Sequence, residues 1–172
     1  MYCGKNKTAI ASQLQITNAM DRLLEKASFC DISISALCKE ADVSRQTFYS
    51  LFDSKEDVVV NSLQQLYCNT EELKKEGPMT FREFCCGFSH FIINNSAYFN
   101  TLFQNHILYL LYESIYDTFI HCCHHSSLYE DNVLAGGLTG IVRSFCEEGC
   151  KASQKELENY MTTLLVPLEC QC

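Results

Sequence analysis

The sequence predicts an all-α protein, and three observations support this fold class. Apolar residues recur every three or four positions along segments of ten residues or more, as they do on one face of an α-helix. Thr80 and Ser153 are each followed three residues later by Glu, which is a helix start signal. The sequence contains no strand-like alternation, internal repeat or low-complexity segment. We therefore expect helices packed on helices.

The first expected helix is long and carries one apolar stripe. The members of the stripe are Ile16, Ala19, Met20, Leu23, Leu24 and Ala27. Phe29 and Ile32 follow, and together with the stripe they are expected to cover the next two helices. Lys5 and Lys7 form a short basic arm ahead of this helix.

Two short helices joined by a tight turn are expected between Ile34 and Phe52. Residues 42–44 form the turn, and the Ser44 hydroxyl can cap the second helix by accepting a hydrogen bond from a free amide of its first turn. The apolar residues of this segment can form one small core, which contains Leu37, Cys38, Ala41, Val43, Phe48, Leu51 and Phe52. The polar residues that face outward are then Arg45, Gln46, Thr47, Tyr49 and Ser50.

This arrangement is the outline of a DNA-reading helix-turn-helix. An α-helix fits the major groove of B-DNA, where Arg pairs with guanine, Gln pairs with adenine and hydroxyl groups reach phosphates. Ser54 is a second cap, with Asp57 three residues later, and it starts another helix directly behind the reading helix. Lys55, in the first turn of that helix, is our first choice for a phosphate contact. The predicted DNA-binding residues are Ser44, Arg45, Gln46, Thr47, Tyr49, Ser50 and Lys55.

Residues 42–56 closely resemble the helix-turn-helix of the TetR family of bacterial transcriptional repressors. The positions that match the family pattern are Val43, Ser44, Phe48, Tyr49, Phe52, Lys55 and Glu56. The resemblance implies that Thr47, Tyr49 and Lys55 hold DNA phosphates. It also implies that Arg45 and Gln46 face bases.

Two residues depart from the family pattern. Asp42 stands where a glycine is usual in the turn, and Asp tolerates a left-handed backbone better than most residues, at some cost in strain. Leu51 stands where His or Tyr is usual, so the resemblance implies no phosphate contact at that position. The first long helix also fits the family, which implies a three-helix head of about fifty residues.

The charge of the chain is unevenly distributed. The net charge of −8 argues against a nucleic-acid binder, yet residues 1–56 contain seven Lys or Arg and seven Asp or Glu. The acidic excess therefore belongs to the other 116 residues. A neutral head can still bind DNA through a few focused cations, with an affinity that falls steeply as salt is added.

Four further helices are expected after the head. The first should stop near Gly77, because Gly terminates helices and Pro78 cannot continue the hydrogen-bond ladder. The second should begin behind Thr80, where Thr80 and Glu83 form a capping box. The expected ranges are 54–77, 81–95, 97–105 and 106–123.

The last two expected helices have apolar stripes that are larger than the core of a small single-chain domain would require. Gly136, Gly137 and Gly140 in the first of them would each weaken a lone helix by about 0.5 to 1 kcal/mol relative to Ala, so they make sense where another backbone comes close. We expect a two-fold dimer in which these helices of both subunits form a four-helix bundle. The predicted interface residues are Leu134, Gly137, Leu138, Ile141, Phe145, Leu157, Met161 and Leu164.

Such a dimer would set the two reading helices about 34 to 36 Å apart, which is one turn of DNA, and the predicted operator is therefore a palindrome. The segment from Gly136 to Gly149 also resembles the C-terminal domain of a Firmicutes-type branch of the TetR family. Phe145 stands where that branch usually has Trp.

An aromatic set in the body has two interpretations. The resemblance implies a cavity for a small apolar effector, whereas periodicity alone indicates an ordinary core. Both interpretations apply to the same residues, which are Phe84, Phe88, Phe91, Phe103, Tyr109, Tyr112 and Tyr116.

Two other clusters also have alternative interpretations. His121 and His125 share a helix face and can bind zinc or copper, but His is also favoured at helix C-termini by the helix dipole. Cys146 and Cys150, one turn apart, and the tail thiols of Cys170 and Cys172 are either redox-sensing thiols or small buried hydrophobic groups. We predict no metal site and no cofactor.

Other features exclude classes of function and place the chain. No secretion signal is visible, and the longest apolar run, from Ile107 to Tyr112, is too short to span a bilayer. These features predict a cytoplasmic protein with no membrane partner, and we expect its twelve cysteines to be mostly reduced. Paired carboxylates, a Ser/His/Asp spacing and a phosphate loop are all missing from the sequence, so an enzyme is not expected.

The leading hypothesis is a homodimeric transcriptional regulator, most simply a repressor, that binds duplex DNA. Residues 1–53 would form the helix-turn-helix domain and residues 54–172 the ligand-binding and dimerisation domain. A small apolar effector that acts on the second domain would release the operator. The alternative is a protein-binding helical adaptor that is anchored on DNA and has no small-molecule effector.

Overall fold

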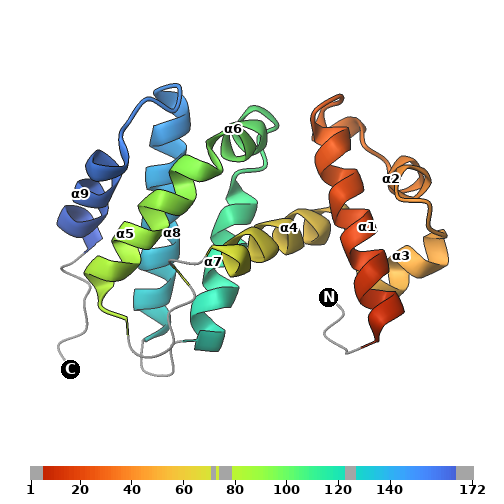
Figure 1. Ribbon diagram of the computed structural model, residues 1–172, viewed down its shortest axis with the longest axis horizontal. Helices are drawn as coiled ribbons and strands as arrows, with labels where there is room; N and C mark the ends of the chain where they lie inside the picture. Colours follow the sequence, from red (N-terminus) through yellow and green to blue (C-terminus); the bar gives the residue numbers. More distant parts are fainter. Residues whose placement is uncertain (1–5, 71–72, 74–78, 123–126, 166–172) are drawn as a thin grey trace. The chain divides into compact units, whose positions relative to one another are not determined.

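The computed structural model describes residues 6–70, 73, 79–122 and 127–165, and over these residues the protein is all-α, as predicted (Figure 1). The chain divides into two compact units, Met1–Leu63 and Gln64–Cys172. In the described part, no helix is both long enough and apolar enough to cross a lipid bilayer.

The first unit contains three helices, a 3₁₀ turn and the start of a fourth helix. The helices α1, α2 and α3 pack against one another. The predicted core of this unit is buried, except that Leu23 and Val43 are half-buried and Ala27, which follows the end of α1, is exposed. In chain order the elements are α1 (Lys7–Leu24), the turn Phe29–Asp31, α2 (Ile34–Glu40), α3 (Arg45–Leu51) and α4 (Lys55–Asn69).

Two hydrogen bonds, one buried and one partly buried, join the first half of α4 to α1. The Thr17 hydroxyl donates to Oδ1 of Asn61 at 3.1 Å, and the Ser62 hydroxyl donates to the Asp21 carboxylate at 3.2 Å. Buried polar side chains are usually paired in this way, because an unpaired polar group loses its hydration without compensation. As a compact body, the first unit therefore continues to Leu63, while the functional boundary at residue 53 stays a prediction.

The helix α4 ends at Asn69, earlier than the sequence predicted. The Thr70 hydroxyl donates to the carbonyl of Leu66 at 3.0 Å, and the Thr70 amide donates to the carbonyl of Tyr67 at 3.1 Å. Both bonds occupy carbonyls of the last helical turn, which otherwise lack partners. The expected stop at Gly77 lies outside the described residues.

The second unit is a bundle in which α8 and α9 contact most of the other helices. The helix α8 packs against α6, α7 and α9, and α9 also packs against α5, which lies beside it in Figure 1. The elements of this unit are α5 (Phe81–Asn94), α6 (Ser96–Gln104), α7 (Tyr109–Cys122), α8 (Leu128–Glu147) and α9 (Gln154–Leu165).

The starts of α5 and α9 lie where the sequence predicted them. The Thr80 hydroxyl accepts from the Glu83 amide at 3.2 Å, and the Glu83 carboxylate accepts from the Thr80 amide at 2.9 Å. Ser153 and Glu156 make the same reciprocal pair at 3.3 and 2.8 Å. A hydrogen bond from the Ser153 hydroxyl at 2.7 Å, and next the one from the Ser153 amide, hold the pKa of the Glu156 carboxyl below its usual value. Both capping boxes are therefore confirmed.

Two other helix starts differ from the expectation. The helix α8 begins at Leu128, behind a capping box of Ser127 and Glu130 that we did not predict. The helix α7 begins at Tyr109 and not at His106, because His106 has a φ of 59° and cannot belong to a right-handed helix.

Candidate nucleic-acid interface

The turn between α2 and α3 uses the left-handed backbone that the sequence predicted. Asp42 has a φ of 54°, the conformation for which glycine is the common choice. The Val43 amide donates to the carbonyl of Cys38 at 3.0 Å, and the Asp42 amide donates to that of Lys39 at 3.3 Å. These two bonds close the end of α2 as a Schellman motif and direct the chain into α3.

Ser44 and Thr47 fix the start of α3. The Ser44 hydroxyl oxygen accepts from the Thr47 amide at 3.0 Å and lies 2.9 Å from the Thr47 hydroxyl. Ser44 is therefore the predicted N-cap. The hydroxyl of Ser50 donates to the carbonyl of Thr47 at 2.7 Å. Ser44, Thr47 and Ser50 thus have roles within the helix besides any contact with DNA.

The two faces of α3 differ in chemistry. Phe48 and Leu51 are buried against the rest of the first unit. Arg45, Gln46 and Tyr49 are exposed on the outward face, and the Arg45 guanidinium carbon lies 5.9 Å from the centroid of the Tyr49 ring. This cation–π contact orients the long Arg45 side chain along the helix. The outward face therefore presents one guanidinium, one carboxamide and one phenol to solvent.

Lys55 points into the first unit. Its ammonium nitrogen donates to the carbonyl of Phe29 at 2.6 Å and to that of Ile32 at 3.1 Å. It also lies 4.3 Å from the centroid of the Phe29 ring. Sequence reasoning placed this side chain among the phosphate contacts, which stays a prediction, and gave no sign of these internal bonds.

The predicted aromatic set of the second unit falls into separate groups. Phe84 stacks on Phe88, and Phe88 contacts Phe91 at a tilt, with ring centroids 5.5 and 5.6 Å apart. Tyr112 and Tyr116 form their own stacked pair at 5.8 Å. Two further members stand apart, because Phe103 is half-buried and Tyr109 is 55% exposed. The first group packs as a core does, and the effector cavity stays a prediction.

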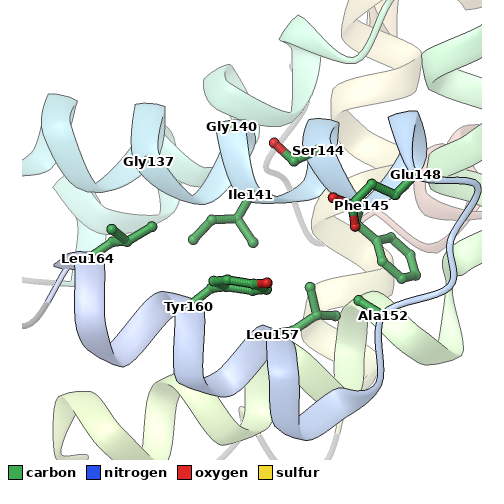
Figure 2. Close-up of a pocket in the computed structure, with 10 residues that line it drawn as sticks. All are labelled: Gly137, Gly140, Ile141, Ser144, Phe145, Glu148, Ala152, Leu157, Tyr160 and Leu164. Atoms are coloured by element: carbon green, nitrogen blue, oxygen red, sulfur yellow. The ribbon is translucent and has the colours of Figure 1, made fainter.

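A groove lies between α8 and α9, where the sequence placed the dimer interface. Figure 2 shows Ile141 and Phe145 of α8 and Leu157, Tyr160 and Leu164 of α9 along it. Its volume is about 480 Å³. Further lining residues are Gly137, Gly140, Ser144, Glu148 and Ala152.

The eight predicted interface residues divide by exposure. Leu138, Phe145, Leu157 and Met161 are buried within the single chain, whereas Leu134, Gly137 and Ile141 are half-buried and Leu164 is 62% exposed. Gly137 already serves the fold of one chain, because a Cβ added there would lie 2.6 Å from Cδ2 of Leu165. Gly136 and Gly140 have open space in the Cβ direction. Sequence reasoning left Tyr160 out of the interface, although it is 56% exposed and lines the groove.

Cys146, at the end of α8, resembles a packing group more than a reactive thiol. Cys146 is buried and hydrogen-bonds with Cys150, whose amide donates to the carbonyl of Phe145 at 2.8 Å. Burial, and next the neighbouring Cys150 thiol, raise the pKa of Cys146 to about 12. Because the thiolate is the reactive form, such a thiol is inert near neutral pH. Cys170 and Cys172 lie outside the described residues.

We expect iodoacetamide at pH 7.5 to alkylate Cys30, Cys68 and Cys86, which are exposed, much faster than Cys146. Peptide mass spectrometry over a time course measures the four rates in the native protein. In urea, where burial is lost, the four rates should converge. A native Cys146 that reacts as fast as Cys30 contradicts the buried, protonated thiol and revives the redox interpretation.

The described residues contain no cluster of three or more metal-ligating side chains. His125 lies outside the described residues, and the side chain of His121 is outside them too. The metal alternative for this pair therefore stays open.

The packing of the first unit and the outward polar face of α3 are those of a helix-turn-helix domain. Residues 16–61 match the family model of bacterial regulatory proteins, tetR family. The first unit is thus a tetR-family N-terminal domain, and the described chain has a TetR-like all-α fold. No curated protein is detectably similar to the chain in sequence.

Three solved structures are similar in fold. Lin0861 from Listeria innocua has a TM-score of 0.73 at 16% identity, with 98% of this chain and 97% of that chain covered. A TetR transcriptional regulator from Streptococcus agalactiae has a TM-score of 0.60 at 19% identity, covering 94% and 97%. The TetR family repressor AlkX from Dietzia sp., implicated in biodegradation of n-alkanes, has a TM-score of 0.54 at 17% identity, covering 91% and 95%. The Firmicutes-type branch is not distinguished by these matches.

Proposed function

We propose that this chain is a DNA-binding transcription regulator that acts as a homodimeric repressor. The observation that carries the proposal is the exposed polar face of α3, on a helix-turn-helix that matches the tetR-family domain. Arg45 and Gln46 supply the guanidinium and carboxamide that recognise guanine and adenine edges in the major groove. The hydroxyls of Thr47 and Tyr49 would bind phosphates and so fix the register of the helix on the duplex. The Ser50 hydroxyl would do the same by releasing the Thr47 carbonyl.

The proposed dimer forms through the α8–α9 face. Tyr160 and Leu164, which both line the groove, are more than half exposed. A soluble protein rarely leaves a contiguous apolar surface open unless a partner covers it. A second copy related by a two-fold axis presents the same face, so each groove receives the exposed side chains of the other copy. Leu138, which is fully buried, would support this interface from beneath.

Gly136 and Gly140 support a close approach of two α8 helices. Both are exposed on α8, and nothing lies within 4 Å of a Cβ added to either residue. In a single chain they only weaken α8, by about 0.5 to 1 kcal/mol each relative to Ala. The absence of a side chain at both positions would let the backbone of the second copy pass close to this face of α8.

We expect Gly140→Ala to separate the stability of one chain from that of the dimer. The new methyl group meets open space within the chain, so the free energy of unfolding of the monomer should rise by about 0.5 to 1 kcal/mol. The same methyl group should weaken the dimer, which analytical ultracentrifugation over a dilution series can measure. Asn159→Ala, which raises helix propensity at an exposed position of α9 outside the groove, is the comparison variant. A dimer of unchanged or greater affinity in Gly140→Ala contradicts the close approach.

The proposed repressor binds a palindrome and is released through the second unit. A two-fold dimer places two α3 helices one DNA turn apart, about 34 to 36 Å. A small apolar effector would bind more tightly to a second arrangement of the two subunits, in which the α3 helices are not one DNA turn apart. The loss of DNA affinity is limited by how much more tightly the effector binds that second arrangement. The aromatic residues Phe103, Tyr112 and Tyr116, which are half-buried, are our candidates for the effector contacts.

The test of the proposed function is selection from a library of random duplexes by the purified protein at low ionic strength. We expect enrichment of a palindrome whose half-sites are centred about 10 base pairs apart. The affinity for the enriched duplex should fall steeply with salt, since phosphate contacts release counterions. Failure to enrich any duplex, with protein that is folded and dimeric, contradicts the proposal.

A further inference from the structure

The Lys55 side chain occupies an unusual place for a lysine. Lys55 is the first residue of α4, where the positive end of the helix dipole repels a cation. The side chain nevertheless folds inward, with its ammonium nitrogen 2.6 Å from the carbonyl oxygen of Phe29 and 3.1 Å from that of Ile32. The ring of Phe29, 4.3 Å away, covers the ammonium group. The two carbonyl oxygens and the face of the Phe29 ring thus compensate the repulsion between the ammonium group and the helix dipole.

These contacts join two parts of the first unit that are distant in sequence. Phe29 and Ile32 belong to the connector between α1 and α2, and both side chains are buried. The next residue, Ser33, caps α2 through a hydrogen bond from the Ala36 amide at 3.1 Å. The ammonium group of Lys55 is therefore bound close to the point where α2 begins.

The other end of the Lys55 side chain is equally well fixed. The Asp57 carboxylate accepts from the amides of Asp53 and Ser54 at 3.1 and 3.0 Å, and the Ser54 hydroxyl accepts from the Asp57 amide at 3.1 Å. This cap holds the short link between the end of α3 and the start of α4. Lys55 consequently fastens the far end of α3 to the near end of α2.

We propose that Lys55 is a positioning residue, which sets the angle of α3 for base reading and does not itself hold a phosphate. The inference rests on the proposed function, because it concerns how the same DNA-binding face is oriented. Two of the three ammonium protons are already bound to protein carbonyls. One proton is left for a phosphate, and the two carbonyls and the Phe29 ring already compensate much of the charge, so such a contact would be weaker than that of a solvent-exposed lysine.

The test compares the full-length wild-type dimer with Lys55→Met, which keeps the length of the side chain but removes its charge and hydrogen bonds. Each protein is titrated with its selected duplex and with a scrambled duplex, at a temperature where circular dichroism shows it folded. Lys26→Met, which removes an exposed cation of the same unit, is the matched control. We expect Lys55→Met to bind the selected duplex about tenfold to a hundredfold more weakly. Its affinity for the scrambled duplex and its salt slope should stay close to those of Lys26→Met.

Two other outcomes overturn the positioning role. A salt slope that becomes shallower by about 0.9 in the logarithmic plot, with both duplexes affected alike, makes Lys55 a phosphate contact. A lower melting temperature with an unchanged ratio between selected and scrambled duplex makes it a purely structural residue. If wild-type protein selects no duplex at all, the proposed function fails, and that result is separate from either outcome for Lys55.

A measurement on the wild-type protein keeps the inference testable if Lys55→Met does not fold. The ¹⁵Nζ ammonium resonance of Lys55 should exchange slowly with water in the free protein and keep its chemical shift when the selected duplex is added. Slow exchange follows from the two carbonyl partners and the covering Phe29 ring. A shift on DNA binding, together with scalar coupling to ³¹P, would show that the ammonium group leaves Phe29 and binds a phosphate.

Discussion

Replacing both Tyr160 and Leu164 by Glu is expected to convert the proposed dimer into monomers and to weaken binding to the selected duplex by about 10²-fold to 10⁴-fold. The loss is large because two linked half-site contacts become one, and the second contact no longer benefits from a high effective concentration. Both side chains are more than half exposed in the single chain, so the substitutions should leave the fold intact. Light scattering reports the mass of the particle, and a titration of the selected duplex reports the affinity.

The matched control for this prediction is Asn159→Glu, which adds the same charge at an exposed position of α9 outside the groove. It should stay dimeric and bind as the wild type does. Leu138 is a poor choice for substitution, because it is fully buried and Leu138→Glu would test the fold of one chain and not the interface. A Tyr160→Glu, Leu164→Glu variant that remains a dimer places the interface on another surface.

Replacing Arg45 and Gln46 by Ala is expected to weaken binding to the selected duplex by about 1 to 3 kcal/mol for each residue whose base contact is bidentate. The loss should be confined to particular base pairs, because each side chain reads one pair while the phosphate contacts remain. Both residues are exposed on α3, and neither is part of the core of the first unit. Repeating the duplex selection with each variant measures the change position by position.

Lys155→Ala is the control for the loss of one positive charge, since Lys155 is an exposed residue of the second unit. It should leave the selected sequence unchanged. If variants of Arg45 and Gln46 enrich the wild-type palindrome with the same preference at every position, other residues must read the bases. A uniform loss of affinity without a change in preference would make both side chains phosphate contacts.

The helix-turn-helix could be predicted from the sequence because its signals are local. The Ser44 cap, the buried Phe48 and the outward polar residues all follow from spacing within one or two helical turns. Asp42 was expected in a left-handed conformation because the resembling family usually has Gly at this position, and its φ of 54° confirms this. The two capping boxes at Thr80 and Ser153 were identified for the same reason.

The inward position of Lys55 could not be predicted in this way. Its partners Phe29 and Ile32 precede it by more than twenty positions, and their backbone carbonyls carry no sequence signal. The pattern around Lys55 predicts only a cation at the start of a helix. In the TetR family, which this segment resembles, the cation at that position faces DNA. Only the packing of the connector against α4 shows that the same side chain reaches protein carbonyls.

The start of α8 shows a different kind of error. Ser127 and Glu130 have the spacing of a capping box, and this signal was present in the sequence. It was missed because the apolar stripe begins only at Leu134, while the first turn carries exposed Leu128 and Tyr129. The end of α4 was misplaced because Gly77 and Pro78 were taken as the stop signal, although the helix already ends at Asn69.

The most direct test of the central claim, that the outward face of α3 lies in a DNA groove, is site-specific photo-crosslinking from position 49. Tyr49 is 49% exposed, so replacing it with the aromatic cross-linker p-benzoylphenylalanine should preserve the fold. We expect crosslinks to the selected duplex at two symmetric positions, one DNA turn apart, and none from the same cross-linker at Tyr129, which is 83% exposed in the second unit. Crosslinks from position 129 but not from position 49 would contradict the account.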